Sequence, residues 1–134
     1  MARPKKPDAK NWRERKFPED WNVTTFRAYL SEMHEKKLGV KYVTPNIKME
    51  CGMIKNMKNE YGPEVLREFI DRALAQYRPT QKYPGISFPV MVRFYKARLI
   101  PRILKELSRQ KEREQQQQQI EVEAVEMDDV LDLL

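Results

Sequence analysis

Cysteine and histidine, two side chains that often perform nucleophilic catalysis or bind transition metals, occur once each among the 134 residues. Cys51 has no second cysteine with which to form an internal disulfide or a multi-cysteine zinc site, and His34 leaves no H-E-x-x-H pattern. His34 also lies beside charged residues, a context typical of a solvated helix surface. We therefore expect no metal, no cofactor and a reducing, intracellular compartment.

The sequence also gives little support for a nucleotide-binding loop or for general acid and base catalysis by carboxyl groups. The four glycines are too far apart for a Rossmann fingerprint or a Walker loop, and the acids at 64, 68 and 71 are spaced for ion pairs on a helix surface. General acid and base catalysis needs carboxyl groups held in a pocket with separated pKa values. We therefore expect that the protein is not an enzyme.

Charge is the strongest signal in the sequence. The net charge is +6, but residues 1–114 hold all 26 bases and 14 of the 20 acids, a net of +12. Residues 115–134 hold six acids and no base. This division predicts a basic body that binds a polyanion, DNA more readily than RNA, and an acidic tail that binds a protein.

The first sixteen residues combine seven bases with two acids, two prolines and Trp12. Mutual repulsion and proline favour a disordered arm, which can follow phosphates or enter a minor groove. The alternative is a terminus that only improves solubility. The bases that we expect to bind nucleic acid here are Arg3, Lys5, Lys6, Lys10, Arg13, Arg15 and Lys16.

Helical periodicity predicts three helices before residue 80. The first begins near Asn22 or Thr24 and ends at Gly39, and the second begins with Thr44 as cap and Pro45 at the first position. The third runs over residues 63–79, where apolar residues recur in pairs every four positions. The expected inward residues are Phe26, Leu30 and Met33; Ile47, Cys51, Ile54, Met57 and Tyr61; and Val65, Leu66, Phe69, Ile70, Ala73, Leu74 and Tyr77.

A second row in the second helix, Met49, Met53 and Met57, widens its apolar face. Such a row is either core filling or an adaptable groove for a partner. Residues 78–88 carry two prolines and a glycine, which predicts a loop packed by Tyr83 and Phe88, with room for one short strand.

A fourth helix is expected from Pro89, with a kink or a restart at Pro101. Its inward residues should be Val90, Met91, Phe94, Tyr95 and Leu99. Residues 93–113 hold eight bases and two acids, a composition that suits either phosphate contact or a solvated face. The candidate phosphate-binding residues are Arg93, Lys96, Arg98, Arg102, Lys105 and Arg109.

Five glutamines at 115–119 predict a linker, and residues 120–134 follow as an acidic tail that ends in aliphatic residues. Such a segment is typical of a short motif that orders on a partner, either as a helix or as an extended peptide. The candidate contact residues are Met127, Val130, Leu131, Leu133 and Leu134.

Together these patterns predict an all-α protein: a compact bundle of four to five helices over residues 17–114, between a disordered arm and a disordered tail. No apolar run approaches the roughly 20 residues needed to span a bilayer, so we expect no membrane partner.

The last seven residues, DDVLDLL, resemble the acidic, leucine-rich C-terminal peptides by which replication and transcription proteins attach to ring-shaped sliding clamps, late-transcription coactivators of T-even phages among them. The small helical body with a C-terminal tail is similar to phage helicase loaders and replisome organisers. These resemblances imply a phage protein in the cytoplasm of a host cell, whose tail binds a clamp, a helicase or an RNA polymerase.

Two functions are consistent with the sequence. The first is a non-enzymatic DNA-binding adaptor in phage-type replication or transcription. The alternative is a host-directed protein–protein inhibitor, in which the methionine row or the tail occupies a host factor and the basic arm is incidental.

Overall fold

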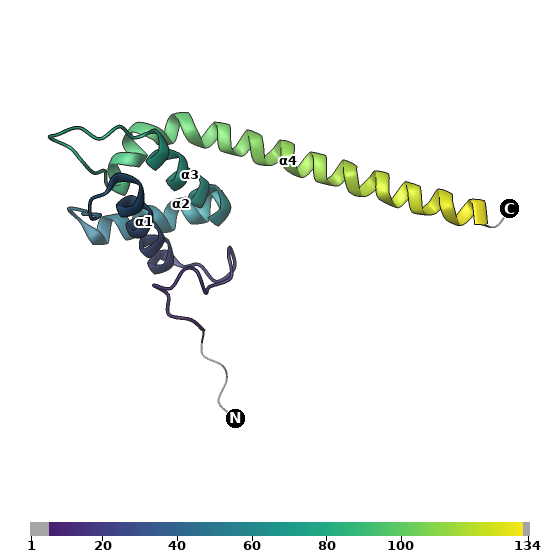
Figure 1. Ribbon diagram of the computed structural model, residues 1–134, viewed down its shortest axis with the longest axis horizontal. Helices are drawn as coiled ribbons and strands as arrows, with labels where there is room; N and C mark the ends of the chain where they lie inside the picture. The colour runs from purple at the N-terminus through teal and green to yellow at the C-terminus, as the bar shows by residue number, and fades with distance from the viewer. Residues whose placement is uncertain (1–5, 133–134) are drawn as a thin grey trace, which may run out of the picture. The chain divides into compact units, whose positions relative to one another are not determined.

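The computed structural model describes residues 6–132, which divide into two compact units between Ile100 and Pro101. Within this range the chain forms four helices and no strand: α1 (Val23–Leu38), α2 (Ile47–Tyr61), α3 (Pro63–Gln76) and α4 (Phe88–Asp132) (Figure 1). The predicted all-α class is thus confirmed for this part of the chain. None of its helices is long and apolar enough to cross a membrane.

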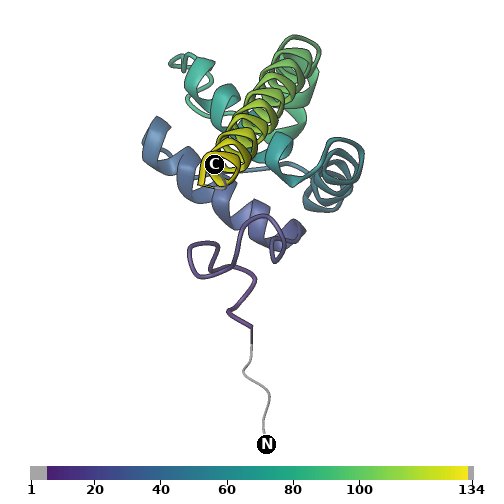
Figure 2. The same ribbon diagram turned by 90° about the vertical axis from the view of Figure 1, so that its right-hand side faces the viewer.

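Helices α1, α2 and α3 contact one another pairwise, and they lie side by side in both ribbon views (Figures 1 and 2). Asn22 caps α1 as predicted, since its side chain accepts a hydrogen bond from the Thr25 N–H at 3.0 Å while the Thr25 hydroxyl accepts one from the Asn22 N–H. Gly39 ends α1 in the left-handed region, at φ 74°. Of the two predicted starts, Asn22 is therefore the one that the structure uses, and the predicted end at Gly39 is confirmed.

The predicted start of α2 is wrong by two residues. Asn46 is the cap, because its side chain accepts a hydrogen bond from the Met49 N–H at 3.0 Å. The Thr44 hydroxyl oxygen is instead buried, without a hydrogen-bond partner among the described residues. The inward stripe is shorter than predicted, with Ile54 and Met57 buried but Ile47 exposed.

Helix α3 follows the sequence prediction closely. Gly62, at φ 94°, separates it from α2, and Pro63 is its first residue. The predicted ion pair between Glu68 and Arg72 forms at 2.9 Å. The predicted stripe is buried as far as the end of the helix: Val65, Leu66, Phe69, Ile70, Ala73 and Leu74.

Helix α4 begins at Phe88, one residue before the predicted start, and continues through Pro101 instead of ending and restarting there. The proline removes the hydrogen bond that would reach the Ala97 carbonyl. Because Ala97 is exposed, water can satisfy that carbonyl.

The glutamine run, predicted to be a linker, lies inside α4. Glutamine is a good helix former. Gln117 and Gln119 also donate hydrogen bonds to the carboxylates four residues ahead, Glu121 and Glu123, at 3.4 and 3.2 Å. The predicted linker and the tail as far as Asp132 are therefore helical.

Candidate binding surfaces

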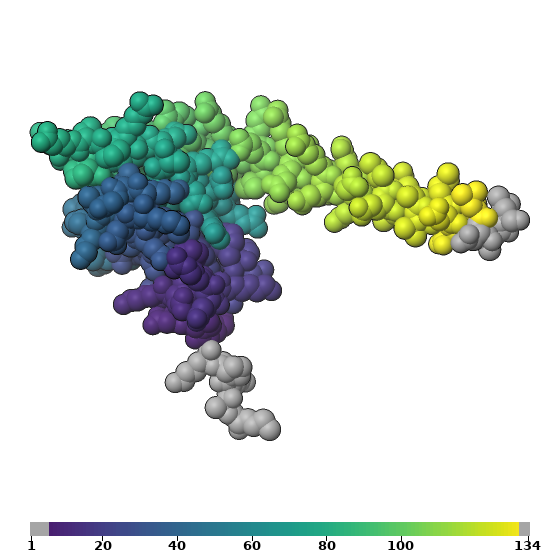
Figure 3. Space-filling view, viewed as in Figure 1, coloured from purple at the N-terminus to yellow at the C-terminus, as the bar shows by residue number. Residues whose placement is uncertain are grey.

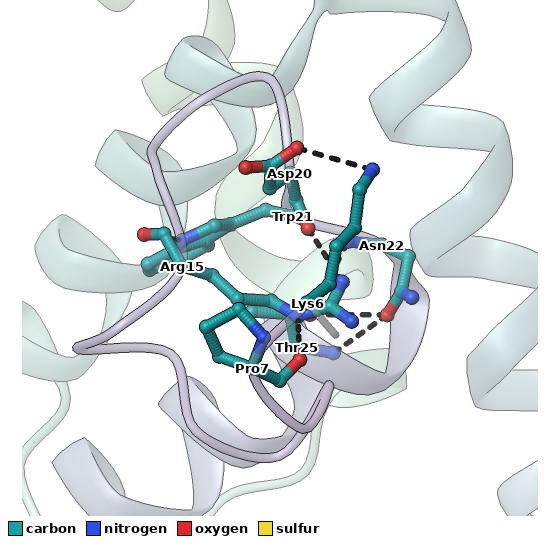
Figure 4. A network of polar contacts seen from close by, with 7 residues as sticks. All are labelled: Lys6, Pro7, Arg15, Asp20, Trp21, Asn22 and Thr25. Carbon is teal, nitrogen blue, oxygen red and sulfur yellow. Dashed lines mark hydrogen bonds and ion pairs between the residues drawn. The ribbon is translucent and has the colours of Figure 1, made fainter. Parts of the chain in front are cut away.

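The described part of the basic arm is held against the helices, contrary to the predicted disorder. Arg15 donates hydrogen bonds to the backbone carbonyls of Pro7 and Asp20, at 3.0 and 2.7 Å (Figure 4). Lys6 pairs with the Asp20 carboxylate at 3.4 Å, and the Trp21 indole N–H donates to the Arg15 carbonyl. These contacts close residues 6–21 into an ordered loop.

Trp12 and Arg13 fasten this loop to α1. The Trp12 indole N–H and the Arg13 guanidinium donate to the two carboxylate oxygens of Glu32, at 2.5 and 2.6 Å. Arg13, with help from Trp12, lowers the pKa of Glu32. In the space-filling view the purple atoms of this segment lie against the body of the protein (Figure 3).

A cluster of aromatic rings completes the attachment. The Arg67 guanidinium lies 4.8 to 5.0 Å from the ring centroids of Phe17, Trp21 and Tyr29, a cation–π arrangement. The Tyr29 hydroxyl donates to Asp71. Burial and that hydrogen bond raise the pKa of Tyr29 to about 12.

The predicted phosphate-binding residues of the arm therefore separate into groups. Arg13 and Arg15 are used by the fold, whereas Lys10 and Lys16 are exposed. Arg3 and Lys5 lie outside the described residues. The sequence contained one signal of this order, Trp12, because a large aromatic residue has little use in a disordered basic arm.

In the first part of α4 the predicted bases lie beside aromatic rings. Arg93 lies 5.5 Å from the ring centroid of Phe94, and Lys96 lies 5.7 Å from that of Tyr61. Arg98 lies 5.3 Å from the ring of Tyr95 and donates to Gln76 at 3.0 Å. Phe94, predicted to point inward, is 65% exposed.

Beyond Pro101, Arg102, Lys105 and Arg109 are all exposed. They follow one another by three and four residues, so that one face of the helix carries all three. Arg113 is the last base of the chain, and every charged residue after it is an acid. The second unit is thus a helix with a basic first half and an acidic second half.

The acidic half also exposes aliphatic side chains. Met127, Val130 and Leu131 from the predicted contact set are exposed, whereas Leu133 and Leu134 lie outside the described residues. Three more exposed residues precede them: Ile120, Val122 and Val125. Such a series of uncovered aliphatic residues marks a surface that needs a partner.

The first unit contains an apolar cavity of about 790 Å³ that sequence reasoning did not find. Its lining comes from the α1–α2 loop, the loop before α4 and the start of α4. Four large side chains in this lining are exposed: Val43, Tyr83, Val90 and Phe94. Tyr83 was predicted to pack its loop, and Val90 and Phe94 were predicted to point inward from the fourth helix. The cavity is therefore built partly from residues that the sequence assigned to the interior.

His34 supports this cavity and is 1% exposed, which corrects the predicted solvated position. The Ile86 N–H donates to its Nε2 at 3.0 Å, so its Nδ1 carries the proton and donates to the Val40 carbonyl, also at 3.0 Å. Both ring nitrogens are thus satisfied. His34 ties two distant loops together, a role that depends on contacts invisible in the local sequence.

A second buried polar group is Glu50, which is 0% exposed. It accepts hydrogen bonds from the Arg27 guanidinium at 3.0 Å and from the Tyr42 hydroxyl, which in turn accepts from the Phe88 N–H at 2.8 Å. Burial raises the pKa of Glu50, against the opposing effect of Arg27. Because the carboxylate is closed to solvent, this network serves the packing of α1, α2 and α4.

Among residues 6–132 no group of three or more His, Cys, Asp or Glu side chains is placed to hold a metal ion. Cys51 is half-buried in α2.

Comparison of the chain with protein-family models, with curated proteins and with solved structures gives no match.

Proposed function

We propose that the protein is a non-enzymatic DNA-binding adaptor of a phage-type replication or transcription system. In this proposal the bases of α4 hold the phosphate backbone. The acidic, aliphatic end of the same helix recruits a sliding clamp, a replicative helicase or an RNA polymerase.

The observation that carries the proposal is the separation of charge along α4. Three exposed bases lie on one face of the helix, Arg102, Lys105 and Arg109. All the charged residues that follow Arg113 are acids. A helix dipole favours acids near its N-terminal end and bases near its C-terminal end, so this order within the second unit is not explained by helix stability. Binding two different partners explains it.

Two of the arm residues predicted to bind phosphate, Arg13 and Arg15, make contacts within the protein. We therefore expect the main DNA contact at α4. Arg13 and Arg15 bond to protein acceptors, and a guanidinium so engaged contributes less to phosphate binding. Beyond Pro101 the α4 bases Arg102, Lys105 and Arg109 are all exposed. Nonspecific attraction to phosphates would supply the affinity, with a strong dependence on salt.

The DNA half is tested by replacing Arg102, Lys105 and Arg109 with glutamine and measuring affinity for a DNA duplex. Removing three phosphate contacts should reduce the slope of log K against log salt by about 2.7. A control variant replaces three α2 lysines by glutamine: Lys48, Lys55 and Lys58. An equal loss in both variants means that net charge alone binds DNA, and no loss in the first variant refutes the assignment.

The recruitment half is tested by deleting residues 128–134. Binding to a purified clamp, helicase or RNA polymerase should disappear, while DNA affinity stays unchanged. Partner binding that survives the deletion removes the tail from the proposal.

The alternative function, a protein–protein inhibitor, is favoured by one observation. In the methionine row Met57 is buried, but Met53 is half-buried and Met49 is exposed, so part of the row can meet a partner. An inhibitor would keep its activity in the α4 glutamine variant, whereas the adaptor would lose it.

A further inference from the structure

The apolar cavity of the first unit has a charged rim of one sign. Three of the residues that line it are bases, Lys41, Arg78 and Lys82, and none is an acid. Its floor and walls are apolar and aromatic, including Val43, Tyr83 and Phe94. A ligand that fits this lining must offer aliphatic groups together with negative charge.

The cavity is formed in advance by hydrogen bonds that hold its loops. The Tyr77 hydroxyl bonds to the carbonyls of Tyr83 and Gly85, at 2.5 and 3.1 Å, and Thr80 and Tyr83 close a turn between them. Ile86 is held by His34. A preformed cavity binds its ligand without the entropy cost of ordering loops.

The chain itself contains a segment with the matching chemistry. From residue 120 onward it carries six acids, no base and a series of large aliphatic side chains. The aliphatic residues that the structure describes there are exposed, Ile120, Val125 and Leu131 among them. Helices that lay an apolar face into a hydrophobic groove are a common mode of peptide recognition.

We propose that the cavity binds the C-terminal segment, residues 120–134, of a second copy of this chain. The aliphatic side chains of that segment would enter the cavity between Val43 and Phe94, and its carboxylates would meet Lys41, Arg78 and Lys82. This inference goes beyond the proposed function, since it concerns self-association and holds whether or not α4 binds DNA.

The main test is sedimentation velocity on the full-length chain over a range of concentrations. The wild-type protein should self-associate, and Phe94→Glu should weaken association at least tenfold, because it places a like charge in the path of an acidic peptide. Phe94 is largely exposed, so this change leaves the core intact. The matched control is Ile47→Glu, the same kind of change at an exposed residue outside the cavity lining.

Charge reversal distinguishes this contact from other modes of association. One variant reverses the rim, with Lys41, Arg78 and Lys82 changed to glutamate. The other reverses the tail by changing all six of its acids to lysine: Glu121, Glu123, Glu126, Asp128, Asp129 and Asp132. Neither should self-associate alone, but a mixture of the two should associate, since the reversed tail now matches the reversed rim. A mixture that stays monomeric overturns the proposal.

Other results also overturn it. A wild-type chain that stays monomeric at all concentrations means that no second copy occupies the cavity. Equal weakening by Phe94→Glu and Ile47→Glu means that the cavity is not the contact. Rim reversal that abolishes DNA binding but leaves self-association unchanged assigns the three bases to nucleic acid.

Discussion

The two units use their side chains in opposite ways. In residues 6–100 most aliphatic and aromatic side chains are buried or half-buried, and even basic residues such as Arg15, Arg27 and Arg67 are engaged in internal contacts. In residues 104–131 the described side chains are exposed or half-buried, and all the charged residues after Arg113 are acids. A base that already makes contacts within the fold is therefore a weaker candidate for binding a partner than an exposed base.

The largest expected difference between the units is in how much a truncated side chain lowers the free energy of unfolding. Phe69→Ala empties a fully buried site in α3 and should lower the free energy of unfolding by about 3 to 5 kcal/mol. Leu131→Ala in the exposed tail should change it by less than about 0.5 kcal/mol. Urea denaturation of both variants checks this. Similar losses in the two would mean that the tail is as well packed as the core.

The next effect concerns the buried ion pair. Arg27→Met leaves the Glu50 carboxylate buried without its cationic partner and should cost about 3 kcal/mol at neutral pH. The double variant with Glu50→Gln removes the stranded charge and should recover most of that loss. A double variant as unstable as Arg27→Met would show that packing, and not charge, is the cause.

The same carboxylate predicts a dependence on pH. Because burial raises the pKa of Glu50, the folded state binds its proton more tightly than the unfolded state does, and stability falls as the pH rises from the unfolded value of 4.5 through the raised folded value. The Arg27→Met loss should therefore shrink as the pH is lowered toward 4.5. Denaturation midpoints across this range measure it, and a loss independent of pH would contradict the assignment.

A smaller effect tests how firmly the cavity is built. A Cβ at Gly85 would lie 2.9 Å from the His34 Cε1, so Gly85→Ala must displace a ring that is held at both nitrogens, at a cost of about 1 to 3 kcal/mol. Gly52→Ala is the control, because its Cβ meets open space in a helix and should stabilise by about 0.5 to 1 kcal/mol. Thermal unfolding with the His34 ring signals followed by NMR separates the two. Undisturbed ring signals in Gly85→Ala would contradict the tight contact.

The smallest effect concerns the attachment of the N-terminal loop. Glu32→Gln weakens the contacts to Trp12 and Arg13, and because this pair is partly exposed the cost should be no more than about 1 kcal/mol. Since Arg13 lowers the pKa of Glu32, the stability from this carboxylate is present above the unfolded value of 4.5 and is lost as the pH falls through the folded value. Tryptophan fluorescence against pH should show release of Trp12 in acid for the wild type. A wild-type signal that does not change with pH would be evidence against this attachment.

How much the sequence predicts differs between elements for physical reasons. The start and the buried face of helix α3 are predicted, although the helix ends at Gln76, before the predicted end at residue 79. The prediction succeeds because a 3.6-residue period and the Gly62–Pro63 boundary are local signals that tertiary contacts reinforce. His34 is misplaced by the same logic, since its burial depends on Val40 and Ile86, contacts that no local pattern contains. The prediction for Phe94 is wrong for a similar reason. Helical spacing shows that Phe94 shares a face with other apolar residues, but it does not show whether another element covers that face.

The candidate binding surfaces divide in the same way. The bases of α4 and the aliphatic residues of the tail are predicted, because charge sorting is visible in the sequence itself. The cavity is not predicted, because it forms where three separate segments meet. The order of the N-terminal loop is also missed, since composition favours disorder and only Trp12 signals the contacts with Glu32 and Tyr29.

The central claim is that α4 holds DNA through its basic face. The most direct measurement is the affinity for a DNA duplex at several salt concentrations, for the wild type, the glutamine variant of Arg102, Lys105 and Arg109, and the glutamine variant of Lys48, Lys55 and Lys58. The claim predicts that only the α4 variant loses affinity, and that its slope of log K against log salt concentration is smaller in magnitude than the wild-type slope by about 2.7. An α4 variant that binds with the wild-type slope would contradict it.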